Sequence, residues 1–260
     1  MINYQSIEGR VEELAAEFRE GVFEYVVIDN FMDPMSADLV FDEFPDPKLA
    51  GLGKSRDYIF AKNKFEKSNL QGAGPNMAKL RNELLSDRFA KFLQAVTGEQ
   101  VFVDPEFHGG GMHQGGKGSY LNMHADFNFH PLNNQWFRNL NILLYMNPEW
   151  KPEYGGRLKL CNKNTGRKAE VDPIFNRCVI MFTRDYTLHG YDEINFPDGK
   201  YRRSIAAYAY SDCNDSHREV RSTTWYPEEG SALKKLVGKN WPKLVSLKSK
   251  IFGSSTAKNK

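Results

Sequence analysis

Six short runs of β-forming residues, separated by turn-forming residues, constrain the fold of this chain most strongly. They lie between Val101 and Asp212 and read VFVD, SYLNMHADF, LNILLYM, RLKLC, RCVIMF and RSIAAYAY. The segments between them are rich in Gly, Pro, Asn and Asp, which favour turns. Short strands that follow one another without helices between them are typical of an antiparallel barrel or sandwich. We therefore predict a mainly β core over residues 101–212 rather than a sheet of βαβ units.

The first hundred residues carry a different, mostly helical pattern, so the expected class is mainly β with flanking α. Apolar residues recur there at helical spacing, and Gly98 ends the last periodic segment. We predict helices over residues 9–20, 76–85 and 86–97, a helix opened by Asp33-Pro34, and a strand over Tyr25–Asp29. The charged, glycine-bearing stretch from Gly51 to Gly74 is predicted to be mostly loop.

Composition excludes several classes of protein. The chain is 40% hydrophobic and 26% charged with a net charge of +2, which is ordinary for a soluble globular protein and gives no strong field toward nucleic acid. Its cysteines, Cys161, Cys178 and Cys213, form no CxxC pair, which argues against a disulfide framework or zinc knuckle. The N-terminus lacks a signal-peptide pattern and no long apolar run occurs, so we expect no membrane span and a cytoplasmic location.

The C-terminal segment differs from both preceding parts. Residues 231–260 carry eight lysines and no acidic residue, mixed with apolar side chains. Such a basic amphipathic segment can bind an anionic surface, but packing on its own domain is the preferred interpretation. We expect residues 1–260 to be a single domain, with a helical and strand lead-in over 1–100, the β core over 101–212 and a basic tail over 213–260.

A metal site is indicated within the β core. If residues 120–127 form a strand, His124 and Asp126 point to the same face. His189 follows the strand predicted at 177–182 and is next to the small Gly190. Two histidines and one carboxylate on one face of an octahedral ion leave three positions free, the arrangement of non-haem iron(II) oxygenases. Taken alone, His124 and Asp126 would be read as a hydrogen-bonded surface pair, and a zinc hydrolase can also use this ligand set.

A second group of residues predicts a carboxylate-binding site. Arg202 and Ser204 share a face of the next predicted strand, and a guanidinium with a nearby hydroxyl can hold one end of a dicarboxylate. Asn141 and Tyr145 share a face of another predicted strand, where the tyrosine hydroxyl can be a third donor. Arg203 is adjacent in sequence but falls on the outer face, so we expect it to carry only a surface charge.

The ordered motifs HAD, YMNPEW, YGGRLKL, FNRCVIMF, LHG and RRS resemble the prolyl 4-hydroxylase-like 2-oxoglutarate/Fe(II) oxygenases, in particular their soluble single-domain branch. The resemblance covers residues 101–212, and VVIDNFMDP is similar to that family's lead-in. It implies a double-stranded β-helix, a jelly-roll related to the cupins, with the N-terminal helices packed on one sheet. It also implies roles for individual residues: iron ligands His124, Asp126 and His189, and 2-oxoglutarate-binding residues Arg202, Ser204 and Tyr145, with Asn141 beside them.

The resemblance further implies the reaction. Such an enzyme uses Fe(2+), O2 and 2-oxoglutarate, with ascorbate as a possible reductant, to hydroxylate an unactivated C–H bond and release succinate and CO2. A prolyl or other amino-acid or peptide substrate is favoured, and no nucleic acid partner is expected. Two alternatives stay open: a non-catalytic jelly-roll binding module, in which the ligands would be lost, and a cupin-type metal enzyme acting on a sugar, which would not need Arg202 and Ser204.

Several other polar residues have simpler interpretations. Gly111–Gly118 is close to a phosphate loop, but Gly118 stands where Ser or Thr must bind magnesium, so we predict a flexible lip of the site. We expect ordinary surface or hydrogen-bonded roles for His108, His113, His130 and His217, and ordinary loop packing for Asn122, Asn128 and Trp136. Among these, His130 follows the predicted ligand strand closely enough for contact with a substrate.

Overall fold

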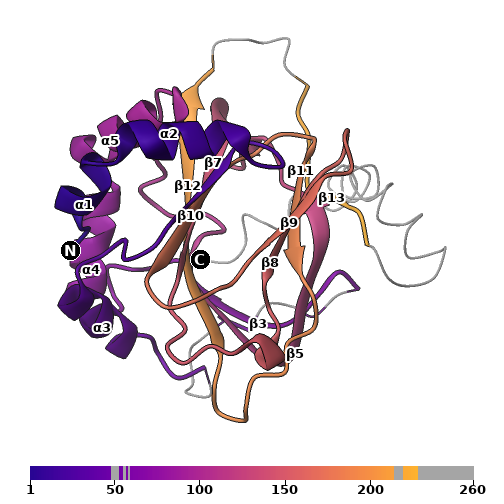
Figure 1. Cartoon of the computed structure of the whole chain (residues 1–260). Coiled ribbons are helices and arrows are strands. Elements are labelled where there is room, and N and C mark those ends of the chain that lie inside the picture. The colour runs from indigo at the N-terminus through magenta and orange to yellow at the C-terminus, as the bar shows by residue number, and fades with distance from the viewer. Residues whose placement is uncertain (48–52, 55–56, 58, 214–218, 228–260) are drawn as a thin grey trace.

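Antiparallel strands form the core of the molecule and curve into a nearly closed, jelly-roll barrel (Figure 1). The computed structural model describes residues 1–47, 53–54, 57, 59–213 and 219–227. Its strands are β1 (Tyr25–Ile28), β2 (Gly53–Lys54), β3 (Ala61–Lys67), β4 (Phe102–Val103), β5 (Gly111–Ala125), β6 (Phe129–His130), β7 (Asn133–Tyr145), β8 (Leu158–Asn162), β9 (Lys168–Val171), β10 (Arg177–Phe182), β11 (Thr187–Tyr191), β12 (Arg202–Asp212) and β13 (Thr224–Trp225). The predicted mainly β, double-stranded β-helix class is confirmed.

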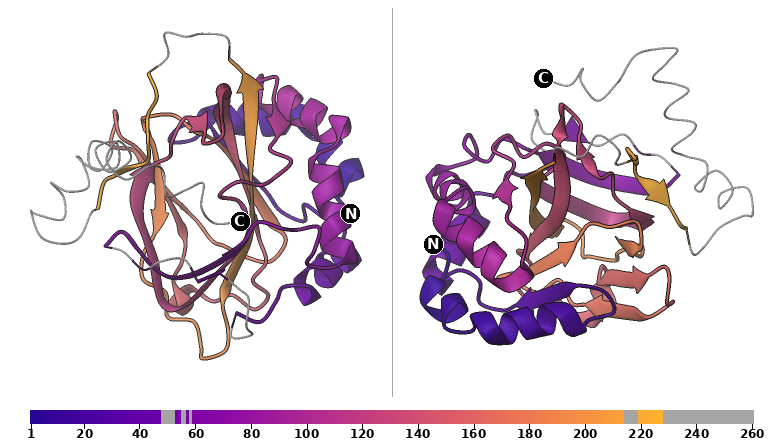
Figure 2. Two further views of the ribbon diagram at one scale, coloured as in Figure 1. Left: turned by 180° about the vertical axis from the view of Figure 1, so that it is seen from behind. Right: turned by 90° about the horizontal axis from the view of Figure 1, so that it is seen from above.

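Helices cover one side of this barrel. They are α1 (Tyr4–Glu8), α2 (Val11–Glu20), α3 (Pro34–Asp42), α4 (Pro75–Leu84) and α5 (Asp87–Thr97), with a short 3-10 helix at Pro152–Tyr154. Figures 1 and 2 show the five α-helices of the described chain gathered on the same side. Their buried side chains join those of β1, β7, β10 and β12 in one apolar cluster. The expected packing of the N-terminal helices on one sheet is therefore confirmed.

Local sequence accounts for where several helices begin and end. Asp33 accepts a hydrogen bond from the Ser36 amide at 2.9 Å and Pro34 occupies the first turn of α3. Ser86 caps α5 in the same way. Gly98 ends α5 with a φ of 80°, a left-handed conformation that glycine adopts at little cost. The helix expected over residues 9–20 begins at Val11 and is preceded by the separate turn of α1.

The order of strands brings the predicted site residues together. The sheet runs β1-β10-β7-β12-β5-β11-β8-β9, so β12 lies between β7 and β5, and β5 lies between β12 and β11. Strands that carry residues 141–145, 202–208, 115–124 and 189 are thus neighbours, although they are far apart in the sequence. Because side chains alternate between the two faces of a strand, register decides which residues face the barrel interior.

Two segments that we expected to be irregular are strands. Gly111–Gly118 is not a flexible lip: it forms the first half of β5 and pairs with β12, with Gly115 opposite Arg202. Glycine is needed there because neighbouring backbone approaches closely, and a Cβ added at Gly111 would overlap the backbone of Lys67 and Ser68. Within the expected loop 51–74, Ala61–Lys67 forms β3 on the other edge of the same part of β5.

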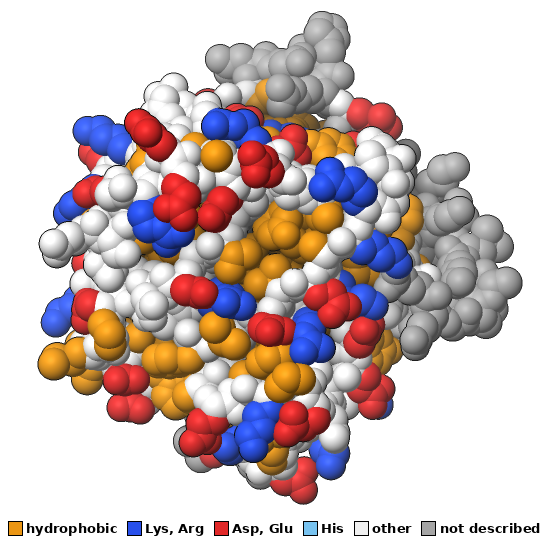
Figure 3. Space-filling view, in the orientation of Figure 1, with side chains coloured by type: hydrophobic (Ala, Val, Ile, Leu, Met, Phe, Trp, Pro, Cys, Tyr) orange, Lys and Arg blue, Asp and Glu red, His pale blue; other side chains and the backbone are white. Residues whose placement is uncertain are grey.

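The surface seen in Figure 3 carries acidic and basic side chains intermingled, with hydrophobic side chains gathered between them near the middle of the view. That face therefore has no extended region of a single charge, in keeping with the net charge of +2. In the described part of the chain, no helix combines the length and the apolar character that crossing a bilayer requires.

Candidate metal centre and its pocket

Three metal-binding side chains meet where β5 and β11 pair. His124 lies directly opposite His189 in the register of these strands, and Asp126 follows the end of β5. Nε2 of His124 is 3.4 Å from Oδ1 of Asp126, and Nε2 of His189 is 3.5 Å from Oδ2. All three donor atoms lie within 4.8 Å of one another. The structure thus brings together the three residues singled out in the sequence, with a donor set that suits iron(II).

The ring of His124 is held in an orientation suited to a metal. Its Nδ1 lies 2.9 Å from the carbonyl oxygen of Asn122, and donation to that oxygen leaves Nε2 free to bind an ion. Trp225 of β13 stacks on the ring, with centroids 4.8 Å apart. Gly190 lets β11 approach β5, because an added Cβ would lie 2.6 Å from the carbonyl oxygen of Leu121. The close approach of the two strands therefore explains why a glycine stands beside His189.

Asp126 is held by two further side chains. Nη2 of Arg138 and Nδ2 of Asn141 each donate to its Oδ2 at 2.9 Å. The Arg138 guanidinium is 1% exposed and lies over the rings of Phe127 and Tyr208, at 4.5 and 3.5 Å from their centroids. These two hydrogen bonds fix the orientation of the carboxylate, and both end on the oxygen that faces His189. The role of Arg138 had no counterpart in the sequence motifs.

Electrostatics keep these groups in the protonation states that a metal needs. Burial alone would raise the pKa of Asp126, but Arg138, His189 and His124 together hold that pKa well below its usual range. Burial, with the neighbouring His124, lowers the pKa of His189 to about 3. The structure therefore favours a charged carboxylate and a neutral His189 imidazole, and metals bind these forms.

A cavity of about 290 Å³ lies against the three side chains, at the small end of the ~300–1,000 Å³ range of ligand pockets. Its wall also contains four residues that the sequence assigned to 2-oxoglutarate: Asn141, Tyr145, Arg202 and Ser204. The cavity is therefore bounded at one place by metal-binding groups and at another by groups that hold a carboxylate. Leu143 and Leu158 supply an apolar part of the same wall.

Arg202 faces the cavity from β12. Its Nε donates to the carbonyl oxygen of Gly156 at 2.7 Å, and Nη2 lies 3.4 Å from the Tyr145 hydroxyl. The guanidinium also lies over the rings of Tyr145 and Tyr191, at 5.0 and 4.2 Å from their centroids. Burial raises the pKa of Tyr145, although Arg202 opposes the rise, so its hydroxyl keeps its proton and can donate. A buried cation and a hydroxyl donor thus face one part of the pocket.

Arg203 points the other way, as strand alternation predicts, but it is not a surface charge. Its Nε donates to Oε1 of Gln114 at 2.9 Å, and its guanidinium lies 4.8 Å from the ring centroid of Phe41. Burial lowers its pKa. The expected exposed position was wrong because the helical layer covers this face of β12. The prediction that Arg202 rather than Arg203 faces the site agrees with this geometry.

Asn141 also lines the cavity, but its amide is engaged elsewhere. Besides donating to Asp126, its Oδ1 accepts from Nη2 of Arg138 at 2.6 Å and from the Thr183 hydroxyl at 3.2 Å. These contacts leave little of its hydrogen-bonding capacity for a bound ligand. The geometry therefore favours a role in holding Asp126 over direct contact with 2-oxoglutarate.

Lys64, Glu66 and His113 are pocket residues that the sequence patterns did not reveal. Lys64 and Arg202 both lie opposite Gly115, and Glu66 and Ser204 both lie opposite His113, so these side chains form two rows on one face of the sheet. The Lys64 ammonium is 2.6 Å from the Glu66 carboxylate. The charged side chains of β3 made its sequence look like that of an exposed loop. Charged residues nevertheless alternate with other residues along 62–66, which is the two-residue period of a strand.

The remaining candidates lie away from the described pocket wall. Asn128 forms hydrogen bonds with the backbone of Glu219 and Arg221, and Trp136 packs edge-on against Phe102. These contacts agree with the ordinary loop packing predicted for both residues. His130 belongs to another cluster of side chains, with Asp104 and His108. His217 and the basic residues 231–260 fall outside the described residues.

Comparisons with known proteins bear on the domain and on the fold. Residues 110–210 match the 2OG-Fe(II) oxygenase superfamily. A prolyl hydroxylase from Trichoplax adhaerens, solved with a hypoxia inducible factor peptide fragment, is 17% identical with a TM-score of 0.57, covering 79% of this chain and 91% of its own. A Pseudomonas putida prolyl-4-hydroxylase is 14% identical with a TM-score of 0.55, and the match covers 78% of this chain and 98% of that protein. The epimerase SnoN is 12% identical with a TM-score of 0.54, and the match covers 86% of this chain and 97% of that protein. No curated protein matches.

The fold is a double-stranded β-helix, and its pocket holds two histidines and one aspartate placed as a metal ion would require. The family match then gives the class of this core: residues 110–210 carry a 2OG-Fe(II) oxygenase domain. The solved structures, all at low identity, add that the chain shares the fold of the prolyl hydroxylases.

Proposed function

We propose that this enzyme hydroxylates an unactivated C–H bond of a prolyl or other amino-acid or peptide substrate. One observation carries the proposal: a single cavity holds both the His124–Asp126–His189 set and the Arg202–Tyr145 pair. A non-catalytic binding module would not retain all three metal-binding side chains in contact. A cupin-type enzyme acting on a sugar would have no use for the buried Arg202 cation in the wall of the same cavity.

His124, Asp126 and His189 are the proposed iron ligands. Nε2 of each histidine and the Asp126 carboxylate converge, and the carboxylate is charged by virtue of Arg138. Two nitrogens and one oxygen suit iron(II) and leave room for further ligands. Bound there, the iron with O2 and 2-oxoglutarate supplies the oxidising chemistry, and succinate and CO2 are released.

Arg202 and Tyr145 are proposed to bind the C5 carboxylate of 2-oxoglutarate. A guanidinium and a phenol hydroxyl give charge-assisted hydrogen bonds to one carboxylate. Gly156 fixes the guanidinium by accepting from its Nε, which leaves the Nη groups directed to the ligand. Ser204, which is 4% exposed and lines the same cavity, is a further hydroxyl for that carboxylate. Leu143 and Leu158 exclude water beside it.

The wall formed by β3 supports a polar substrate. Lys64 and Glu66 add one charge of each sign to the cavity. Groups of both signs suit amide or zwitterionic groups of an amino acid or peptide better than a hydrocarbon. The similarity to a prolyl hydroxylase solved with a peptide fragment supports the same substrate class.

The test is succinate release by the iron-loaded protein with 2-oxoglutarate, O2 and a panel that holds proline, proline-containing peptides, other amino acids and a sugar. Mass spectrometry of each candidate measures the gain of one oxygen. The proposal predicts substrate-dependent succinate with that mass gain on an amino acid or peptide. A product of unchanged mass would contradict hydroxylation and favour epimerisation. A mass gain on the sugar alone would contradict the substrate class.

A further inference from the structure

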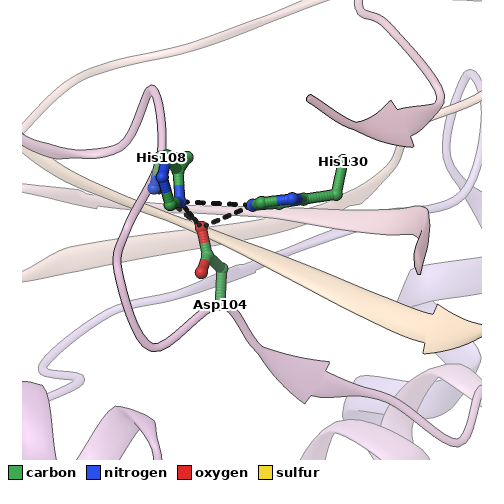
Figure 4. Close-up of side chains that lie close together, drawn as sticks. All are labelled: Asp104, His108 and His130. Atoms are coloured by element: carbon green, nitrogen blue, oxygen red, sulfur yellow. Dashed lines mark hydrogen bonds and ion pairs between the residues drawn. The ribbon is translucent and has the colours of Figure 1, made fainter. Parts of the chain in front are cut away.

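A second cluster of one aspartate and two histidines lies outside the pocket (Figure 4). Asp104 follows β4, His108 comes one turn later and His130 ends β6. Oδ2 of Asp104 is 3.2 Å from Nδ1 of His108 and 3.4 Å from Nε2 of His130, and these two nitrogens are 3.2 Å apart. Figure 4 shows both rings and the carboxylate directed at one point. We propose that this cluster binds a second divalent metal ion, of the zinc class.

The distances between the donor atoms fit such an ion. Zinc binds histidine nitrogen and carboxylate oxygen at about 2.0–2.1 Å, so two ligands of a tetrahedral zinc are about 3.3–3.4 Å apart. The cluster has separations of 3.2, 3.2 and 3.4 Å. His108 is about one-third exposed, at 32%, and a water reaching the ion from that side completes four-coordination. The donors are therefore set for a zinc-class ion with little rearrangement.

Charge gives an independent reason. The Asp104 side chain is 1% exposed, and within the described chain its ion-pair partners are His108 and His130, with no Lys or Arg. Buried carboxylates are normally paired with a cation or coordinate a metal. A divalent ion supplies the missing positive charge.

The carboxylate is already oriented for this role. The amides of Glu106 and His108 donate to Oδ1 and Oδ2 of Asp104, at 3.0 and 2.7 Å. One contact changes when an ion binds: the Leu132 amide now donates to Nδ1 of His130 at 3.2 Å, and binding through Nε2 moves the ring proton to Nδ1. Leu132 is 63% exposed, so water can take over this long hydrogen bond.

The position of the site indicates what the ion does. His108 is next to Gly109, which lines the iron pocket and whose carbonyl oxygen accepts a hydrogen bond from the Tyr208 hydroxyl at 2.8 Å. An ion held by Asp104, His108 and His130 ties this turn to β6. It thereby fixes one wall of the pocket without touching the reacting groups.

The test is metal stoichiometry on the full chain, stripped with a chelator and titrated with Zn²⁺ alone by calorimetry. The His189→Ala variant weakens the first cluster and isolates the second. The proposal predicts two equivalents for the wild type and one tight equivalent for His189→Ala. Adding His108→Gln should weaken that equivalent by more than about a hundredfold, beyond the 10–100-fold seen when only an outer partner of a ligand is lost.

His108→Gln is preferred to a change at Asp104 because the ring is partly exposed, so its loss should leave the fold intact; circular dichroism checks this. Two results would overturn the proposal. One is a His189→Ala protein that binds no zinc, in which case the cluster is a hydrogen-bonded junction without an ion. The other is a tight equivalent that survives His108→Gln, which would locate the ion elsewhere.

Discussion

The two His-Asp-His clusters contain the same residue types in settings that differ. His124, Asp126 and His189 border a cavity of about 290 Å³ that also holds a buried arginine. Asp104 and its two histidines lie at a junction between a turn and β6, outside the described wall of that cavity. Asp126 is balanced by Arg138, whereas Asp104 is paired only with imidazoles among the described residues. Ligand type alone therefore does not define a catalytic site. The adjoining cavity and the Arg202–Tyr145 pair proposed to bind the cosubstrate distinguish the first cluster.

The largest expected effect separates the two clusters directly. His189→Ala should reduce substrate-dependent succinate release to background, because one of three proposed iron ligands is gone. His108→Gln in the second cluster should keep most of the turnover. Succinate assays on both variants, with iron content measured in each, check this. Equal losses in the two variants would break the distinction between a catalytic and a structural cluster.

The choice of variant matters at Asp126. Its carboxylate neutralises the buried Arg138, so replacing it with glycine removes a ligand and also leaves a buried charge unpaired, at a cost of about 3–5 kcal/mol. Asp126→Gly is therefore a less clean test of chemistry than His189→Ala. We expect a lower midpoint of thermal unfolding for Asp126→Gly than for His189→Ala in metal-free protein, and calorimetry measures both.

The next effect concerns the Arg202–Tyr145 pair beside the first cluster, which we propose binds the C5 carboxylate of 2-oxoglutarate. Arg202→Ala should weaken 2-oxoglutarate binding by at least tenfold, because truncating one partner of a buried charge pair costs about 2–5 kcal/mol and each 1.4 kcal/mol is about tenfold. Arg203→Ala is the matched control on the opposite face. It should lower stability through lost contact with Phe41 while leaving 2-oxoglutarate affinity unchanged. If a 2-oxoglutarate titration shows the large loss for Arg203→Ala and the small one for Arg202→Ala, then Arg203 and not Arg202 binds the cosubstrate.

The smallest effect tests what supports the ligand carboxylate. Asn141→Leu removes a donor to Asp126 with little change of volume, and loss of such an outer partner typically weakens metal affinity by about 10–100-fold. We expect that loss for iron(II), with 2-oxoglutarate affinity of the iron-loaded protein nearly unchanged. A selective loss of 2-oxoglutarate affinity would instead make Asn141 a direct contact of the cosubstrate.

Sequence reasoning found those parts of the site that depend on local periodicity. Because neighbouring side chains on a strand point to opposite faces, alternation alone predicted that His124 and Asp126 lie on one face and that Arg202 and Arg203 lie on opposite faces. Helix ends at Asp33 and Gly98 were predictable from capping chemistry. These features need only the residues within a few positions of each other.

Features that depend on pairing between distant strands were missed. β3 was expected to be loop because its charged residues face a polar cavity rather than water. The glycines of β5 were expected to form a lip, since nothing local indicates that Lys67 and Ser68 approach them. The support of Asp126 by Arg138 and the meeting of Asp104 with His130 likewise arise from tertiary structure.

The proposed function requires one pocket to bind iron(II) and 2-oxoglutarate together. Anaerobic titration of the metal-free protein with iron(II) and 2-oxoglutarate, followed by visible absorption, tests it most directly. We expect a weak charge-transfer band when both are present, no band for His189→Ala, and a band for Arg202→Ala only at much higher 2-oxoglutarate. A wild-type protein that takes up iron but develops no band, or a His189→Ala variant that keeps the band, would contradict joint binding in this pocket.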